Sequence, residues 1–130
     1  MTLRGVEAAS LLDVFEGGAG DALLMSYLYY TGDATDLLEN VLHSRDRRGL
    51  GLQNMYRYRN ARVDELIEQA GRSGILSDRQ VAFEEATRLA MRDLPLVPLW
   101  EVPWVSGVAD GVEWTPAPNG WFHAAGVRWR

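Results

Sequence analysis

The order of elements along this sequence predicts an α/β fold with a small mixed sheet, flanking helices and an extended C-terminal tail. An apolar run between turn signals at 22–30 is typical of a buried strand. Helical periodicity then dominates the chain as far as Pro95. Beyond it, Pro98 and Pro103 also lack backbone donors, so this stretch is expected to be an edge strand or an extended crossover.

Length and composition indicate a single globular domain. The chain has 130 residues, of which 47% are hydrophobic and 24% are charged. We expect one domain over 1–130, with a lobe-like α/β part at 1–95 and an extended crossover and tail at 96–130. No apolar run reaches the length of a membrane span, and the N-terminus shows no signal-peptide pattern. The lack of cysteine excludes disulfides, thiolate metal ligands and a cysteine nucleophile.

A helix and then a strand are expected at the start of the chain. Leu11, Leu12 and Phe15 stand at helical spacing, and Ser10 precedes them as a residue type that caps helices. The glycines of "GGAG" end this helix. The run "ALLMSYLYY" (22–30) follows as the buried strand.

The next helix is expected to begin directly after that strand. Gly32 stops the strand, and Asp33 or Thr35 can cap the helix. Its apolar positions are Leu37, Leu38, Val41 and Leu42. A polar loop with several glycines follows at 43–54, and "MYRYR" is expected to be a short extended piece.

A strongly amphipathic helix is predicted after Asn60, which is its expected N-cap. One face carries an apolar stripe at i, i+3, i+4 and i+7. The stripe consists of Val63, Leu66, Ile67 and Ala70. A glycine, Gly71 or Gly74, is expected to close the helix.

The last helix has the clearest start signal. Ser77 and Gln80 form a capping box pattern, and Leu76 and Val81 stand where a hydrophobic staple would form. Pro95 ends the helix. The positions expected in the core are Ala82, Ala86, Leu89 and Ala90.

The tail is rich in turns and aromatic residues. Short strands are expected at 112–114 and 127–129. The tail also contains Trp104, Trp114, Trp121 and Trp129. Two interpretations stay open with equal weight: these residues cover the core of this domain, or they pack on something else.

The sequence contains no catalytic or cofactor motif. There is no lysine for a P-loop, no complete dinucleotide fingerprint, no His-Glu-x-x-His and no Gly-x-Ser-x-Gly. His43 and His123 are expected to be surface residues. Among acids close in sequence, Asp36 suits the first turn of a helix, and Glu84 and Glu85 suit a solvated face. We therefore expect no enzyme activity, no cofactor and no metal.

One basic segment, "RDRRGLGLQNMYRYRNAR" (45–62), holds six arginines interleaved with Tyr56 and Tyr58. Single-stranded nucleic acid is bound by such combinations of cations and stacking rings. However, Asp46 interrupts the segment and the net charge of the chain is −5. A solvated loop is the better interpretation, and nucleic acid is not expected as a partner.

Four pieces follow one another in an order that resembles a known family. "YYTGDATDLLENVLHS" is a strand, a turn and an acid-rich helix start, and "SDRQVAFEEATRLAMRD" is a capped helix with an early arginine that leads into "LPLVPLW". The segment "NMYRYRNARVDELIEQA" has five motif positions in register, namely Asn54, Tyr58, Asn60, Asp64 and Leu66. The order resembles the C-terminal part of the dipeptide- and oligopeptide-binding class (family 5) of extracellular solute-binding proteins of ABC importers.

The resemblance implies that this chain is a fragment of one lobe of a type II periplasmic-binding-protein fold, and that it binds a peptide or a similar small solute without catalysis. Asp33 stands where the peptide-binding members pair an aspartate with the α-amino group of the ligand. The predicted site comprises Asp33, Gly32, Thr31 and Tyr30. A carboxylate at a strand end opens onto a cleft, and its pair with an ammonium is strong where water is excluded. The alternative is that Asp33 only caps the following helix.

Departures from the family pattern affect the ligand and the partners. Tyr29 and Tyr30 replace the usual Gly-Trp, which alters the cleft wall, and Ala61 replaces a proline after Asn60. Family members are several times longer and bind the ligand between two lobes. The resemblance therefore implies an extracytoplasmic parent that works with the membrane subunits of an ABC importer. Self-association through exposed edges and the tail is also expected.

The sequence leaves two alternatives to solute binding. The first is an interaction or regulatory module that holds a protein or nucleic acid through the Arg/Tyr loop and the Trp-rich tail. The second is a small hydrolase that uses Asp33 and another acid. It ranks last, because the sequence supplies no activated nucleophile and no metal site.

Overall fold

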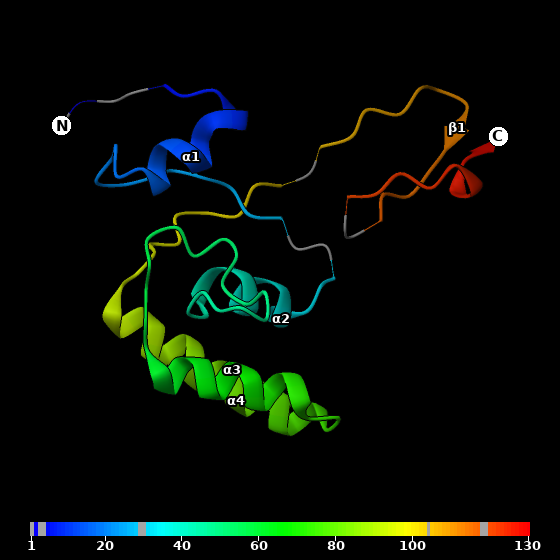
Figure 1. Ribbon diagram of the computed structural model, residues 1–130. Coiled ribbons are helices and arrows are strands. Elements are labelled where there is room, and N and C mark those ends of the chain that lie inside the picture. The colour runs from blue at the N-terminus through cyan, green and yellow to red at the C-terminus, as the bar shows by residue number, and fades with distance from the viewer. Residues whose placement is uncertain (1, 3–4, 29–30, 104, 118–119) are drawn as a thin grey trace.

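The structure is a computed structural model that describes residues 2, 5–28, 31–103, 105–117 and 120–130. Helices α2, α3 and α4 form one body, and strands β1 and β2 lie apart from it near the C-terminus (Figure 1). The elements in chain order are η1 (Ala8–Ser10), α1 (Leu11–Glu16), α2 (Ala34–Leu37), η2 (Leu38–Leu42), α3 (Ala61–Arg72), α4 (Leu76–Asp93), β1 (Val112–Glu113), η3 (Ala124–Gly126) and β2 (Arg128–Trp129).

The core lies between α3, α4 and the α2–η2 segment. The four stripe residues of α3 are all buried, as the sequence predicts. Helix α4 contributes three alanines that are at most 2% exposed, and their small side chains let the two helices pack closely. The buried cluster consists of Leu38, Leu42, Val63, Leu66, Ile67, Ala70, Ala82, Phe83, Ala86 and Ala90. Burial of this apolar surface is the main force that holds the helices together.

The helix at 34–42 changes pitch along its length. Helix α2 continues into η2, a π-helical turn that the backbone bond from His43 N to Leu38 O closes at 2.9 Å. The wider turn buries Leu38, Val41 and Leu42, three of the four positions that the sequence assigns to this helix.

The predicted cap of α3 is confirmed, whereas the predicted start of α4 is wrong. The Asn60 side chain accepts hydrogen bonds from the backbone of Arg62 and Val63. Helix α4 begins at Leu76 rather than after Ser77, and its N-cap, Ile75, makes no side-chain capping bond. Only residues 73–75 separate α3 from α4, so the short turn sets where the second helix begins.

The capping box and the hydrophobic staple predicted for α4 are therefore also wrong. The Gln80 side chain donates to Glu84 Oε1 at 2.8 Å instead of turning back toward the start of the helix. Leu76 and Val81, the staple pair, are both exposed. The helix ends at Asp93, two residues before Pro95, and Leu94 adopts a left-handed conformation there (φ 50°).

The buried strand predicted at 22–30 is wrong for its described part, 22–28, which forms no strand and leaves Leu24 72% exposed. Among the described residues, the strands are β1 and β2, and they pair only with each other. A strand without a neighbour leaves its backbone groups unpaired, so the apolar run alone does not make one. The fold is thus helices with a two-stranded antiparallel sheet rather than a mixed sheet.

The tail forms the two predicted short strands, with Val112 opposite Trp129. Trp114 packs on Phe122 at 5.5 Å between ring centroids. However, Trp129 is 82% exposed, and among the described residues that pack against the core cluster Leu96 is the last along the chain. The interpretation that the tryptophans of the tail cover this core is therefore wrong for Trp114, Trp121 and Trp129, and Trp104 lies outside the described residues.

We predict that Ile67→Ala lowers the free energy of unfolding by about 2–5 kcal/mol, because Ile67 is fully buried and its loss leaves a cavity. Ile75→Ala is the matched control, since Ile75 is 60% exposed and should change stability by no more than about 0.5 kcal/mol. Urea unfolding followed by circular dichroism measures both. Equal losses in the two variants would contradict the core described above.

Candidate functional site

The predicted site lies in the turn that leads into α2. Gly32 adopts a left-handed conformation (φ 68°), and a Cβ at this position would meet no atom of the described residues within 4 Å. The Thr31 hydroxyl accepts a hydrogen bond from Asp33 N at 3.2 Å. The structure thus brings Thr31, Gly32 and Asp33 together, while Tyr30 lies outside the described residues.

The Asp33 carboxylate caps α2, as one of the two sequence interpretations expects. Its Oδ1 accepts hydrogen bonds from Thr35 N at 2.8 Å and from the Thr35 hydroxyl, and its Oδ2 accepts one from Arg79 Nη2 at 2.8 Å. The bonds from Thr35, and after them the contact with Arg79, lower the pKa of Asp33 below its usual value. Asp33 is therefore an anion that is 44% exposed, and its role toward a ligand stays a prediction.

Arg79 connects three helices at this point. It belongs to α4, its Nη2 reaches Thr35 Oγ1 at 3.0 Å on α2, and its Nη1 donates to the Ala70 carbonyl at 3.1 Å on α3. Its guanidinium also lies 5.4 Å from the ring centre of Phe83. The only local signal for Arg79 in the sequence is an arginine four residues before a phenylalanine on one helix face. That spacing predicts the contact with Phe83 but not the one with Asp33.

A second polar cluster surrounds His43. This side chain is only 2% exposed, so the prediction that His43 lies on the surface is wrong. The loop after η2 folds over α3 and covers the ring. His43 Nδ1 lies 2.6 Å from Ser44 O, and Nε2 lies 3.3 Å from Glu68 Oε1. Both ring nitrogens thus face oxygen atoms of this cluster. Ser44 N in turn donates to Asp64 Oδ1 at 2.8 Å.

Glu68 is the charged centre of this cluster. It accepts hydrogen bonds from Arg48 at 2.6 Å and from Arg72 at 3.0 Å, in addition to its contact with His43. These contacts, the one with Arg48 foremost, lower the pKa of Glu68 to about 2. With its ring nitrogens and carboxylates already engaged, the cluster joins the loop to α3.

Asn54 fixes the loop that precedes α3. It is buried, its Nδ2 donates to the carbonyls of His43 and Tyr58 at 3.0 and 2.8 Å, and its Oδ1 accepts from Tyr58 N at 2.9 Å. The Tyr58 hydroxyl and the Asn60 side chain both donate to Asp93 Oδ2 on α4. All five motif positions therefore have structural roles, since Asp64 holds Ser44 and Leu66 lies in the core.

The arginine and tyrosine segment is not arranged as a stacking platform. The Tyr56 hydroxyl donates to Val41 O at 2.8 Å, and the Tyr58 hydroxyl donates to Asp93 at 2.6 Å. Burial, with the bond to Asp93 second, raises the pKa of Tyr58 to about 12. Arg48 and Arg62 are in ion pairs with acids of this chain. Both rings are partly buried and held by the fold, so base stacking gains no support here.

Among the described residues, no group of three or more His, Cys, Asp or Glu could hold a metal ion. Within the same part of the chain, no helix has the length and apolar composition that crossing a membrane requires. Comparisons of this chain with family models, with curated proteins and with solved structures each give no match. The chemistry that the Asp33 site offers is the binding of a cation by a partly exposed carboxylate.

We predict that Glu68→Gln lowers the free energy of unfolding at neutral pH, and that its difference from the wild type disappears in acid. Because the pKa of Glu68 is lower in the folded chain, its stabilisation is fully present above the ordinary value of 4.5. It is lost as the pH falls from there to about 2. Urea unfolding at a series of pH values measures this.

Glu65→Gln is the control, because Glu65 lies on the same helix but is 63% exposed and, within the described part of the chain, has its ion pair with Arg62 alone. It should change stability little at any pH. A Glu68→Gln variant as stable as the wild type at neutral pH would contradict the role of this carboxylate. A difference that stays constant down to pH 2 would do so as well.

Proposed function

We propose that this chain is the C-terminal part of a solute-binding protein of an ABC importer, and that it binds the free amino end of a peptide without catalysis. The observation that carries the proposal is the state of Asp33. Its carboxylate is held ionised by Thr35 and Arg79, is 44% exposed, and lies beside the open backbone of Gly32. An exposed anion in fixed orientation is what recognition of an ammonium requires.

The carboxylate has room for one more donor. Each carboxylate oxygen accepts about two hydrogen bonds. Among the described residues, Oδ1 accepts two hydrogen bonds, both from Thr35, whereas Oδ2 accepts one, from Arg79. The ammonium of a ligand would therefore bind at Oδ2, beside the guanidinium, without displacing the helix cap. In this arrangement Arg79 orients the carboxylate, and the ligand adds a second cation to the same oxygen.

The ordered motif supports the wider family assignment. Asn54 closes the loop, Asn60 caps α3, and Asp64 holds the backbone of Ser44, so each of these residue types has a local physical reason. On this basis we propose that the helices belong to one lobe of a type II periplasmic-binding-protein fold. The parent protein would act outside the cytoplasm together with the membrane subunits of its importer.

The exposed tail fits the same proposal. Trp100, Trp121 and Trp129 are each more than half exposed, and an apolar surface of this kind favours contact with a further partner. In the proposed parent, the tail crosses to the other lobe. Self-association of the isolated chain would cover the same residues.

We predict that the wild-type chain binds short peptides with a free amino terminus, and that Asp33→Asn weakens this binding about 10- to 100-fold, because it removes a charge-assisted bond. Asparagine is also a good N-cap, so α2 keeps its start. Acetylation of the peptide amine should weaken binding to the wild type by a similar factor. Isothermal titration calorimetry measures each affinity.

Asp78→Asn is the matched control, because Asp78 is exposed and stands one residue before Arg79. It makes the same chemical change close to Arg79 in the sequence but outside the Asp33 turn, and peptide affinity should not change. Unchanged affinity in Asp33→Asn, or equal affinity for acetylated and free peptides, would overturn the site assignment.

A further inference from the structure

We propose that residues 22–28 are an interaction surface, on which a second copy of this chain pairs as an antiparallel strand. The proposal does not rest on peptide binding at Asp33. The sequence predicts a strand here, and the described part runs as an extended trace between α1 and α2 (Figure 1). Among the described residues it has no neighbouring strand. Because a strand needs such a neighbour, the prediction and the structure agree if the neighbour comes from a second molecule.

The backbone of this segment is open to pairing. Within the described part of the chain, no backbone N–H or carbonyl group of 22–26 takes part in a hydrogen bond. The segment contains no proline, glycine or charged residue, and Leu24 is 72% exposed. An exposed apolar run with unpaired backbone donors and acceptors is a template for the addition of another strand.

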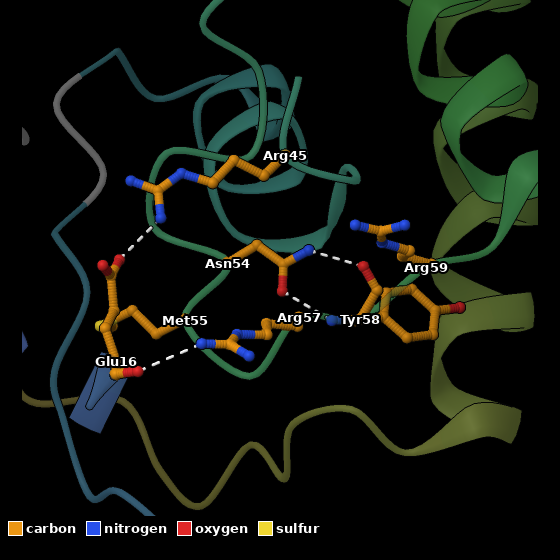
Figure 2. Close-up of a pocket in the computed structure, with 7 residues that line it drawn as sticks. All are labelled: Glu16, Arg45, Asn54, Met55, Arg57, Tyr58 and Arg59. Atoms are coloured by element: carbon orange, nitrogen blue, oxygen red, sulfur yellow. Dashed lines mark hydrogen bonds and ion pairs between the residues drawn. The ribbon is translucent and has the colours of Figure 1, made fainter. Parts of the chain in front are cut away.

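Contacts on both sides of the segment fix it to the helical body. Before it, the Glu16 carboxylate at the end of α1 pairs with Arg45 at 2.8 Å, and the Glu16 carbonyl accepts a hydrogen bond from Arg57 at 3.2 Å (Figure 2). At its other end, the Tyr27 hydroxyl donates to the carbonyl and the carboxylate of Asp36 at 3.0 and 3.1 Å. The residues between these contacts are held in place before a partner arrives, which lowers the entropy cost of pairing.

The segment is complementary to itself. Antiparallel pairing about a two-fold axis at Met25 places Leu23 opposite Tyr27 of the second copy, and Leu24 opposite Ser26. Aliphatic and aromatic side chains stabilise antiparallel strands when they face each other, and this register brings no two charges together. Leu23 and Tyr27 are half-buried whereas Leu24 and Ser26 are exposed, which is the alternation that a strand requires. Such a contact uses the same edge of both copies, so it closes after two chains.

The surface area of the chain is sufficient for such an interface. A compact protein of 14.6 kDa exposes about 6,900 Å². This chain exposes 10103 Å². The excess is larger than the roughly 800 Å² that each partner buries in a standard interface. Pairing of two copies at 22–28 covers part of that excess, including Leu24, Met25 and Leu28, which are each more than 40% exposed.

The first test uses single cysteines in the full chain, which contains none of its own. Met25→Cys should meet its own copy on the two-fold axis at a Cα separation of about 4.5–5.5 Å, which a disulfide can bridge. Air oxidation should therefore give a covalent dimer on a non-reducing gel. Leu76→Cys is the matched control, because Leu76 is 77% exposed at the start of α4, and it should stay monomeric.

The second test measures the mass of the chain over a concentration series by sedimentation equilibrium. The wild type should reach the mass of two chains. Met25→Lys should weaken the dimer about tenfold or more, because it places two like charges opposite each other and removes apolar contact. Its circular dichroism should not change, since Met25 lies outside the core cluster. Val102→Lys makes the same charge change at an exposed position of the tail and should leave the dimer intact.

Three results would overturn the proposal: a monomer at every concentration, equal cross-linking of Leu76→Cys and Met25→Cys, or equal weakening by Val102→Lys and Met25→Lys. Amide hydrogen exchange identifies the alternative occupant. Exchange at 22–28 should slow as the concentration of the chain rises. If it slows only when a short peptide is added, the strand partner is a peptide; the dimer is then refuted while peptide binding stands.

Discussion

The structure depends on one guanidinium. Arg79 reaches from α4 to the cap of α2 through Asp33 and Thr35, and to the last turns of α3 through the Ala70 carbonyl, while its plane lies against Phe83. Arg79 thus fixes the start of the α2–η2 segment against the helix pair, while His43 and Ser44 join its far end to α3 through Glu68 and Asp64. The same side chain holds the Asp33 carboxylate in place and, after the hydrogen bonds from Thr35, helps to lower the pKa of Asp33. Arg79 therefore contributes both to the packing of the helical body and to the geometry of the candidate site.

Local sequence predicts the helical body well because its signals are local. The stripe of α3 repeats over consecutive turns, and Asn60 caps it with a side chain only two and three residues away from its donors. The strand expected at 22–30 is not seen in its described part, 22–28, for the opposite reason. A strand needs a neighbouring strand to pair with, and an apolar run alone does not show that such a neighbour exists. The start of α4 fails because the short turn at 73–75 sets the beginning of the helix, and the Ser77 signal is then inside its first turn.

In the candidate sites, too, local features could be predicted from the sequence and long-range contacts could not. The capping role of Asp33 is local and could be read from the sequence, whereas its partner Arg79 is 46 residues away along the chain. The burial of His43 depends on how the loop folds over α3, where Ser44 N donates to Asp64 and His43 contacts Glu68. None of these contacts leaves a periodic pattern. The sequence therefore identifies the acid Asp33, whereas its cation partner Arg79 is known only from the structure.

The proposed function depends on the binding of a peptide at the Asp33 site. Its most direct test is a native mass spectrum of the purified chain after incubation with a mixture of short peptides that have free amino termini. The expected result is a complex whose mass exceeds that of the bare chain by one peptide. A spectrum that shows only the bare chain, or its oligomers without peptide, would contradict the claim that the Asp33 site binds a ligand.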